Sequence, residues 1–90
     1  MKVVINNCFG GYSLSKEAYD YLGIEYDGYG YAFSDDRDNQ KLVKCVENLG
    51  NLADGRCAKL KVVEIPDNID WYIDDYDGIE TIREKHQTWG

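Results

Sequence analysis

One stretch of the sequence decides the fold: Ala58-Lys59-Leu60-Lys61-Val62-Val63-Glu64-Ile65. Apolar residues and lysines alternate over its first five positions, and a period of two is the pattern of a β-strand with one buried face. The stretch stops before Pro66, the only proline of the chain, which has no backbone N–H to donate to a sheet. We therefore predict a strand over residues 58–65 and place the other elements around it.

Three further segments carry strand patterns. Residues 2–6 include three consecutive β-branched side chains, which predict a short, buried strand. Residues 26–33 alternate large aromatic side chains with glycine and alanine, so a strand is expected there, with a small face that another backbone or a ligand can approach closely. A fourth, short strand is expected over residues 70–74.

Two helices follow from capping residues and apolar periodicity. The first has Ser13 or Ser15 as its N-cap and runs to about Leu22, where a glycine follows. The second covers about residues 39–49, with apolar side chains on one face and another glycine after its end.

A third helix is predicted over about residues 78–88, because Asp77 and Glu80 fit the N-cap and third position of a capping box. The element order β-α-β-α-β-β-α then predicts an α+β fold. We expect a single domain over residues 1–90, in which three helices cover a mostly antiparallel sheet of three to four strands.

Composition limits the class of protein. The chain has 90 residues and a formal net charge of −7, which argues against a nucleic-acid or acidic-membrane binder that relies on bulk charge. No apolar run has the length of a signal-peptide core or a transmembrane helix. The three cysteines are Cys8, Cys45 and Cys57. Their odd number predicts reduced thiols in a cytoplasm, and their spacing does not match a zinc site.

Negative charge is concentrated between residues 64 and 80, where seven carboxylates occur without any Lys or Arg. Four of them fit a strand face, a turn or a helix cap, and the spacing is not that of an EF-hand, so we predict no metal site. The remaining three are Asp70, Asp74 and Asp75. We predict that they form an acidic surface for a basic partner protein.

A second candidate site begins at the glycine-containing turn over residues 6–15, between a strand and a helix start. Such a turn can offer free backbone amides to an anion, or it can be a tight turn in which glycine supplies positive φ. The pattern lacks the spacing of a P-loop or a dinucleotide fingerprint. The candidate ligand-binding residues are Asn6, Cys8, Gly10, Gly11, Ser13, Tyr29, Tyr31, Arg37 and His86. Arg37 and the aromatic rings would hold a planar or phosphorylated ligand.

Cys8 and His86 also define an enzyme hypothesis, in which the thiol is activated near a helix N-terminus and the imidazole acts as base. Each has a structural alternative. A free cysteine is commonly a small buried hydrophobe, and His86 shares a predicted helix face with Ile79, Ile82 and Trp89, which favours a packed, hydrogen-bonded ring. No catalytic residue is therefore assigned.

Several blocks of the sequence together resemble a known family. The blocks are Asn6-Asn7-Cys8-Phe9-Gly10-Gly11-Tyr12-Ser13-Leu14-Ser15, Arg37-Asp38 leading into Leu42-Val43, Val63-Glu64-Ile65-Pro66-Asp67, and Tyr76-Asp77-Gly78 closing on His86 and Trp89. They span nearly the whole chain and resemble a family of short, uncharacterised proteins encoded by bacteriophages and prophages. The resemblance implies a small accessory protein that acts on host systems.

These observations lead to a functional hypothesis and two alternatives. We expect a non-enzymatic phage accessory protein in the host cytoplasm that counters host defence by sequestering a small, nucleotide-like ligand. The first alternative is an acidic inhibitor that docks on a basic host protein, and the second is a small Cys/His enzyme. No cofactor, metal, direct nucleic-acid contact or membrane contact is expected, and a homo-oligomer stays open.

Overall fold

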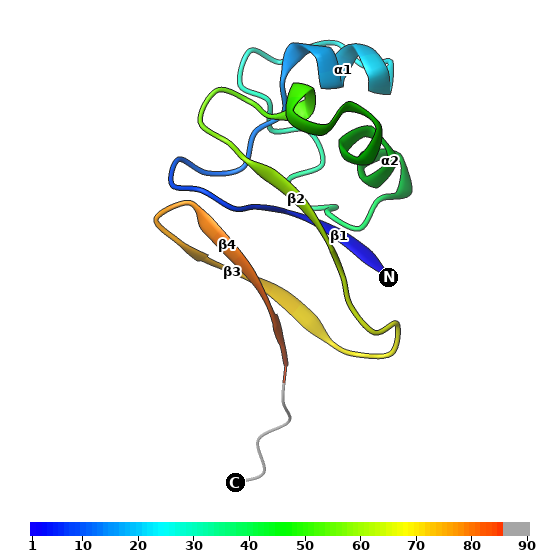
Figure 1. The fold of residues 1–90 in the computed structure, drawn as a ribbon, viewed down its shortest axis with the longest axis vertical. Helices are drawn as coiled ribbons and strands as arrows, with labels where there is room; N and C mark the ends of the chain where they lie inside the picture. The colour runs from blue at the N-terminus through cyan, green and yellow to red at the C-terminus, as the bar shows by residue number, and fades with distance from the viewer. Residues whose placement is uncertain (86–90) are drawn as a thin grey trace, which may run out of the picture.

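The structure is a computed structural model and describes residues 1–85. Its elements follow the order β-α-α-β-β-β, with one short 3-10 helix after the second α-helix. They are β1 (Lys2–Asn6), α1 (Lys16–Leu22), α2 (Gln40–Leu49), η1 (Gly50–Ala53), β2 (Leu60–Glu64), β3 (Trp71–Tyr76) and β4 (Ile79–Glu84). The helices lie at one end of the molecule, β1 and β2 lie in the middle, and the β3–β4 hairpin lies at the other end (Figure 1).

The predicted strands at residues 2–6 and 58–65 are confirmed and pair with each other. β1 and β2 form an antiparallel sheet in which Val3 lies opposite Val63 and Val4 opposite Val62. Because Met1 O accepts a hydrogen bond from Ile65 N, the odd-numbered residues of β1 direct their backbone groups toward β2. Its even-numbered residues therefore direct theirs toward the opposite edge.

The two predicted helices near residues 15–22 and 39–49 are also confirmed, and their caps explain their limits. Ser15 precedes α1 and its side chain accepts a hydrogen bond from Ala18 N. Asn39 precedes α2 and its side chain accepts one from Lys41 N. Each cap satisfies an amide that the first helical turn leaves without a partner.

α2 packs on the β1–β2 sheet, α1 packs against α2 and η1, and together they close the hydrophobic core. Its largest completely buried side chains include Leu14, Tyr19 and Leu42, which meet Val4 from β1. Leu60 and Val62 of β2 pack against the edge of this cluster. The core thus lies between the helices and the inner sheet, and the β3–β4 hairpin lies outside it.

The predicted third helix is wrong within the described residues, because residues 79–84 form β4. Asp77 and Gly78 have φ of 52° and 91° and make the two-residue turn of a hairpin between β3 and β4. Asp-Gly is a preferred sequence for this turn, in which both residues need positive φ. Glu80 does not complete a capping box but is buried on β4.

The predicted strand over residues 26–33 is also wrong, because this segment is irregular. Gly28 and Gly30 have φ of 86° and 85°, and Phe33 has φ of 61°. These left-handed positions turn the chain repeatedly and prevent an extended strand. The fold is therefore α+β, but it has two α-helices rather than three, and two separate two-stranded antiparallel sheets replace the expected single sheet.

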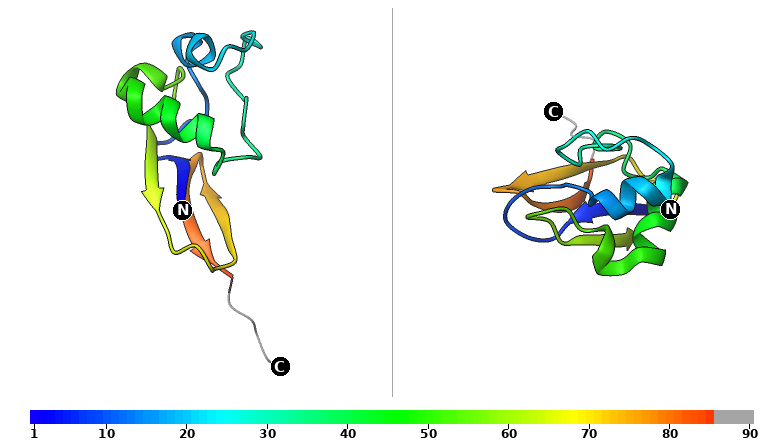
Figure 2. Two further views of the ribbon diagram at one scale, coloured as in Figure 1. Left: turned by 90° about the vertical axis from the view of Figure 1, so that its right-hand side faces the viewer. Right: turned by 90° about the horizontal axis from the view of Figure 1, so that it is seen from above.

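β1 and β4 lie side by side between the outer strands β2 and β3 (Figure 2). No backbone ladder joins them in the described structure, which is why the two sheets are separate. The edge of β1 that faces β4 bonds instead to two residues: Val4 N donates to Arg37 O at 2.9 Å, and Asn6 N donates to Glu80 Oε1 at 2.7 Å. Arg37 and Glu80 thus fill the junction between the two halves.

Candidate functional site

The junction between β1 and β4 contains a buried ion pair, Arg37 with Glu80. Nη1 of the guanidinium lies 2.6 Å from Oε1, and Nη2 lies 2.8 Å from Oε2, so the contact is bidentate. The side chains are only 8% and 6% exposed. Such a pair is strongly oriented, and removing one partner would leave the other charge buried and uncompensated.

The remaining contacts of Arg37 also come from the protein itself. Its Nε donates to Ser34 O at 2.9 Å, its Nη1 also donates to Val4 O at 3.3 Å, and its guanidinium carbon lies 3.7 Å from the centre of the Tyr12 ring. Burial raises the pKa of Tyr12, so the ring beneath the guanidinium stays a neutral phenol at physiological pH. The structure thus uses Arg37 to join the two halves of the fold.

Asn6, the first predicted ligand-binding residue, is completely buried and ties three turns together. Its side-chain amide donates to Cys8 O at 2.7 Å and to Gly78 O at 2.6 Å, and its carbonyl accepts from Lys59 N at 2.8 Å. A side chain at Gly78 would collide with the backbone of Gly11. The glycine turn is therefore packed against the hairpin turn.

The other predicted residues of this turn are also engaged in packing. The thiol of Cys8 donates to Cys57 O at 3.0 Å, and a side chain at Gly10 would strike the same carbonyl. Ser13 O accepts from Gly55 N at 3.0 Å. His86 lies outside the described residues. The structure thus brings Asn6, Cys8, Gly10, Gly11 and Ser13 together as packed turns rather than as the wall of a cavity.

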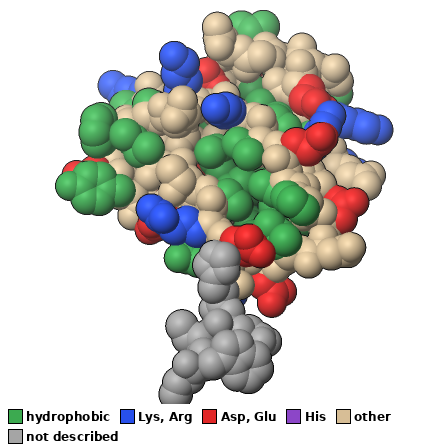
Figure 3. Space-filling view, turned by 60° about the horizontal axis from the view of Figure 1, so that its bottom comes forward, with side chains coloured by type: hydrophobic (Ala, Val, Ile, Leu, Met, Phe, Trp, Pro, Cys, Tyr) green, Lys and Arg blue, Asp and Glu red, His purple; other side chains and the backbone are tan. Residues whose placement is uncertain are grey.

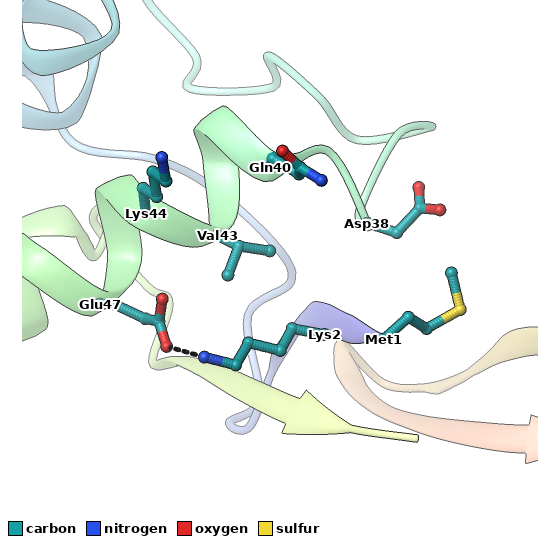
Figure 4. Close-up of a pocket in the computed structure, with 7 residues that line it drawn as sticks. All are labelled: Met1, Lys2, Asp38, Gln40, Val43, Lys44 and Glu47. Carbon is teal, nitrogen blue, oxygen red and sulfur yellow. Dashed lines mark hydrogen bonds and ion pairs between the residues drawn. The ribbon is translucent and has the colours of Figure 1, made fainter. Parts of the chain in front are cut away.

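An open pocket lies elsewhere, between the start of β1 and α2, and has a volume of about 450 Å³ (Figure 4). Its lining residues are Met1, Lys2, Asp38, Gln40, Val43, Lys44 and Glu47. None of them belongs to the predicted ligand-binding set. Lys2 is held across the pocket by an ion pair of 2.8 Å with Glu47, and this hydrogen bond raises the pKa of the lysine.

Tyr29 and Tyr31 lie on the surface in the irregular segment of residues 24–34, which we call the tyrosine loop. The two side chains are 70% and 58% exposed. Their rings stack with an interplanar angle of 10° and a centroid distance of 5.8 Å. That distance leaves no room for a third ring between them. A planar group can therefore stack only on an outer face of the pair.

Asp27 organises the tyrosine loop from within. Its carboxylate accepts backbone N–H bonds from Gly30 at 2.6 Å, Tyr29 at 2.8 Å and Tyr31 at 3.3 Å. These bonds, foremost those from Gly30 and Tyr29, hold the pKa of Asp27 below its ordinary value. The backbone beneath both exposed rings is thus fixed by one side chain.

The tyrosine loop is also attached to the body of the protein at two points. Gly30 O accepts a hydrogen bond from Leu14 N at 2.8 Å, and any side chain at Gly30 would collide with the Leu14 backbone. Ala32 N donates to the buried Tyr19 hydroxyl at 2.9 Å, and Ala32 O accepts from Tyr12 at 2.7 Å. The stacked tyrosines therefore stand on a preorganised support.

The tyrosine loop lies within an acidic part of the sequence. Residues 17–36 include six carboxylates and no Lys or Arg. The members are Glu17, Asp20, Glu25, Asp27, Asp35 and Asp36. Exposed aromatic faces beside carboxylates attract cationic groups, above all the planar guanidinium, which can stack and pair at the same time.

The predicted partner-binding carboxylates lie on or beside β3, but two of them already have partners. Asp74 forms an exposed ion pair of 2.7 Å with Arg83 on β4. Asp75 accepts a hydrogen bond of 2.8 Å from Gly78 N in the turn. Asp70 is exposed, and its backbone carbonyl accepts from Lys85 N. Asp74 and Asp75 therefore lie on β3 and Asp70 directly before it, and the three do not form a single cluster.

Comparison with known protein families, curated proteins and solved structures finds no match for this chain. Over residues 1–85, neither α-helix has the length and apolar character needed to cross a bilayer. The same part of the chain gathers no group of three or more His, Cys, Asp or Glu residues that could hold a metal ion.

Proposed function

We propose that this protein is a non-enzymatic binding protein that docks its tyrosine loop on a basic surface of another protein. The observation that carries the proposal is the stacked, exposed pair Tyr29 and Tyr31 on a support fixed by Asp27. Tyrosine is enriched at protein interfaces because a rigid ring offers a large contact area at small entropic cost. A preorganised loop lowers that cost further.

The charge of the loop determines the chemistry of the partner. The formal net charge is −7, and no cationic side chain occurs between residues 17 and 36. A basic partner is attracted over a distance and oriented as it approaches, whereas an acidic one is repelled. Arginine fits better than lysine, because its planar group stacks on the outer face of a tyrosine while pairing with a carboxylate.

The biological setting is proposed from the family resemblance alone. A small accessory protein of a phage or prophage would act in the host cytoplasm, and a basic host protein involved in defence is a fitting target for an acidic surface. Sequestering of a nucleotide-like ligand stays a prediction. The residues expected to form its pocket lie instead in three places, which are the packed turns, the buried ion pair and the exposed tyrosine stack.

The test is a titration of the purified protein with two peptides, one of alternating glycine and arginine and one in which lysine replaces arginine. We expect tighter binding of the arginine peptide, and a loss of about tenfold in affinity for the double variant Tyr29→Ala with Tyr31→Ala. Phe9→Ala is the matched control, since Phe9 is 66% exposed but lies outside the loop. Equal affinities of the double variant and the parent protein would refute the proposal.

A further inference from the structure

β3 is an edge strand, and its outer side carries unpaired backbone groups. Asp70 O accepts from Lys85 N, so Asp70 and Lys85 are a hydrogen-bonded pair, and such pairs alternate along an antiparallel ladder. Trp71, Ile73 and Asp75 therefore direct their N–H and C=O groups away from β4. Within residues 1–85 no hydrogen bond reaches these groups.

Apart from the carboxylates of Asp74 and Asp75, this edge lacks the features by which proteins commonly protect a strand from pairing. β3 is six residues long and contains no proline and no lysine, and its register with β4 runs without a bulge from Trp71 to Tyr76. By contrast, Asp54 covers the start of the outer β2 edge by accepting from Leu60 N, and Lys59 and Lys61 are exposed on β2 and the residue before it. Edges are usually blunted by lysine, proline, bulges or coverage.

We propose that the β3 edge binds a basic, extended segment of a partner protein, which adds to the hairpin as a third strand. This site is separate from the tyrosine loop and does not rest on the function proposed above. Main-chain hydrogen bonds would supply affinity, and alternate side chains would supply specificity, as in other cases of strand addition.

The negative charge around β3 favours a basic segment as the strand that pairs with its edge. Between Pro66 and Ile82 the chain has six carboxylates and no Lys or Arg. A second copy pairing through its own β3 would bring these carboxylates face to face, which is destabilising for directly opposed strands. A strand with lysine or arginine at alternate positions would instead place cations beside Asp70 and Asp74, which lie on the same face of the hairpin.

The apolar face of the hairpin favours apolar residues at the remaining positions of the added strand. Trp71 and Ile73 share one face with Ile82, because Ile73 lies opposite Ile82 in the ladder, and all three are only partly buried. Hydrophobic side chains gather at the centre of the face at this end of the molecule, with charged side chains around them (Figure 3). An added strand would extend this face, so its residues should alternate between basic and apolar.

The test uses the full chain, labelled with ¹⁵N, and an octapeptide of alternating lysine and valine with blocked ends. Two matched peptides separate charge from pairing: one has glutamate in place of lysine, and one keeps lysine but is N-methylated at alternate residues. We expect slowed hydrogen exchange at the amides of Trp71, Ile73 and Asp75, no binding of the glutamate peptide, and about tenfold weaker binding of the methylated one.

A variant of the protein tests the same hydrogen bonds by changing the β3 edge instead of the peptide. Ile73→Pro removes one outward N–H without breaking a bond to β4, and proline is tolerated at such edge positions; we expect it to weaken binding of the lysine peptide. Equal binding of the methylated and unmethylated peptides would overturn the proposal whether or not this variant folds. Protection of the same amides by rising protein concentration alone would also overturn it, because the occupant would then be a second copy.

Discussion

Two regions of the molecule reverse the usual distribution of side chains. One is the junction between β1 and β4, and the other is the tyrosine loop. At the junction, Arg37 and Glu80 carry full charges and are almost completely buried. In the loop, Tyr29 and Tyr31 have large aromatic rings and are mostly exposed. Burying charges and exposing aromatic rings both oppose the ordinary trend of protein folding, so each needs a reason.

The difference between the two regions is in how completely their groups are satisfied. Every donor described on Arg37 meets an acceptor within the protein, and Glu80 also accepts from Asn6 N. The rings of Tyr29 and Tyr31 stack on each other and are mostly exposed, although hydrogen bonds anchor the backbone beneath them. A saturated polar group serves the fold, whereas an exposed ring on a rigid support is available for binding.

The largest expected effect concerns the junction. Glu80→Gln keeps the side-chain volume but leaves the Arg37 charge buried without a counter-charge. We expect a loss of about 3–5 kcal/mol in the free energy of unfolding, measured by urea denaturation. The control is Asp74→Asn, which breaks the exposed pair with Arg83 and should cost about 1 kcal/mol or less. If the two variants lost similar stability, the junction would not be the main connection between the halves.

A smaller effect is expected where the loop meets the body. Gly30→Ala adds a side chain at positive φ and against the Leu14 backbone, so it should cost about 1–3 kcal/mol in the free energy of unfolding. Gly28→Ala is the matched control, because Gly28 also has positive φ but faces open space; its cost should be about 1 kcal/mol. Equal costs at both positions would show that the contact with Leu14 does not fix the loop.

The smallest effect on stability concerns Asp27. Its pKa in the folded protein lies below the ordinary value of 3.8, so its carboxylate stabilises the fold above that value, and the contribution is lost as pH falls through the folded pKa. Asp27→Asn should therefore lower the urea midpoint slightly at neutral pH and leave it unchanged relative to the parent once the pH is below the folded pKa of Asp27. Amide exchange at Tyr29 and Gly30 reports the same change locally, and a difference that persisted in acid would contradict this assignment.

Local sequence signals predict the two α-helices, which begin at capping residues, and the strand β2, which has an alternating pattern. Ser15 and Asn39 mark the starts of both α-helices, and the alternation of residues 58–62 marks β2. Where two local patterns competed, the prediction failed. Asp77 and Glu80 satisfy the spacing of a capping box, yet Asp77-Gly78 between two runs rich in aromatic and β-branched residues is also the signature of a hairpin, and the hairpin is what forms.

The candidate site was predicted in part. The sequence identifies Tyr29 and Tyr31 as binding residues, but it predicts them on a strand because the regular spacing of Gly28 and Gly30 imitates alternation. Arg37 is predicted to contact a ligand because it follows the aromatic segment of Tyr29 and Tyr31 in the sequence, whereas its partner in the structure, Glu80, lies 43 residues away. No local pattern in one sequence reveals a contact over that separation, so a buried structural arginine and a binding arginine look alike.

The contact between Arg37 and Glu80 also has a consequence for biosynthesis. Glu80 is translated 43 residues after Arg37, and β1 acquires its neighbour β2 only after both helices have been made. The residues of α1 and α2 therefore emerge before the strands that lie beside β1 have been made. Translation must pass the hairpin before the guanidinium is neutralised, so premature termination before residue 80 would release a polypeptide that cannot complete its fold.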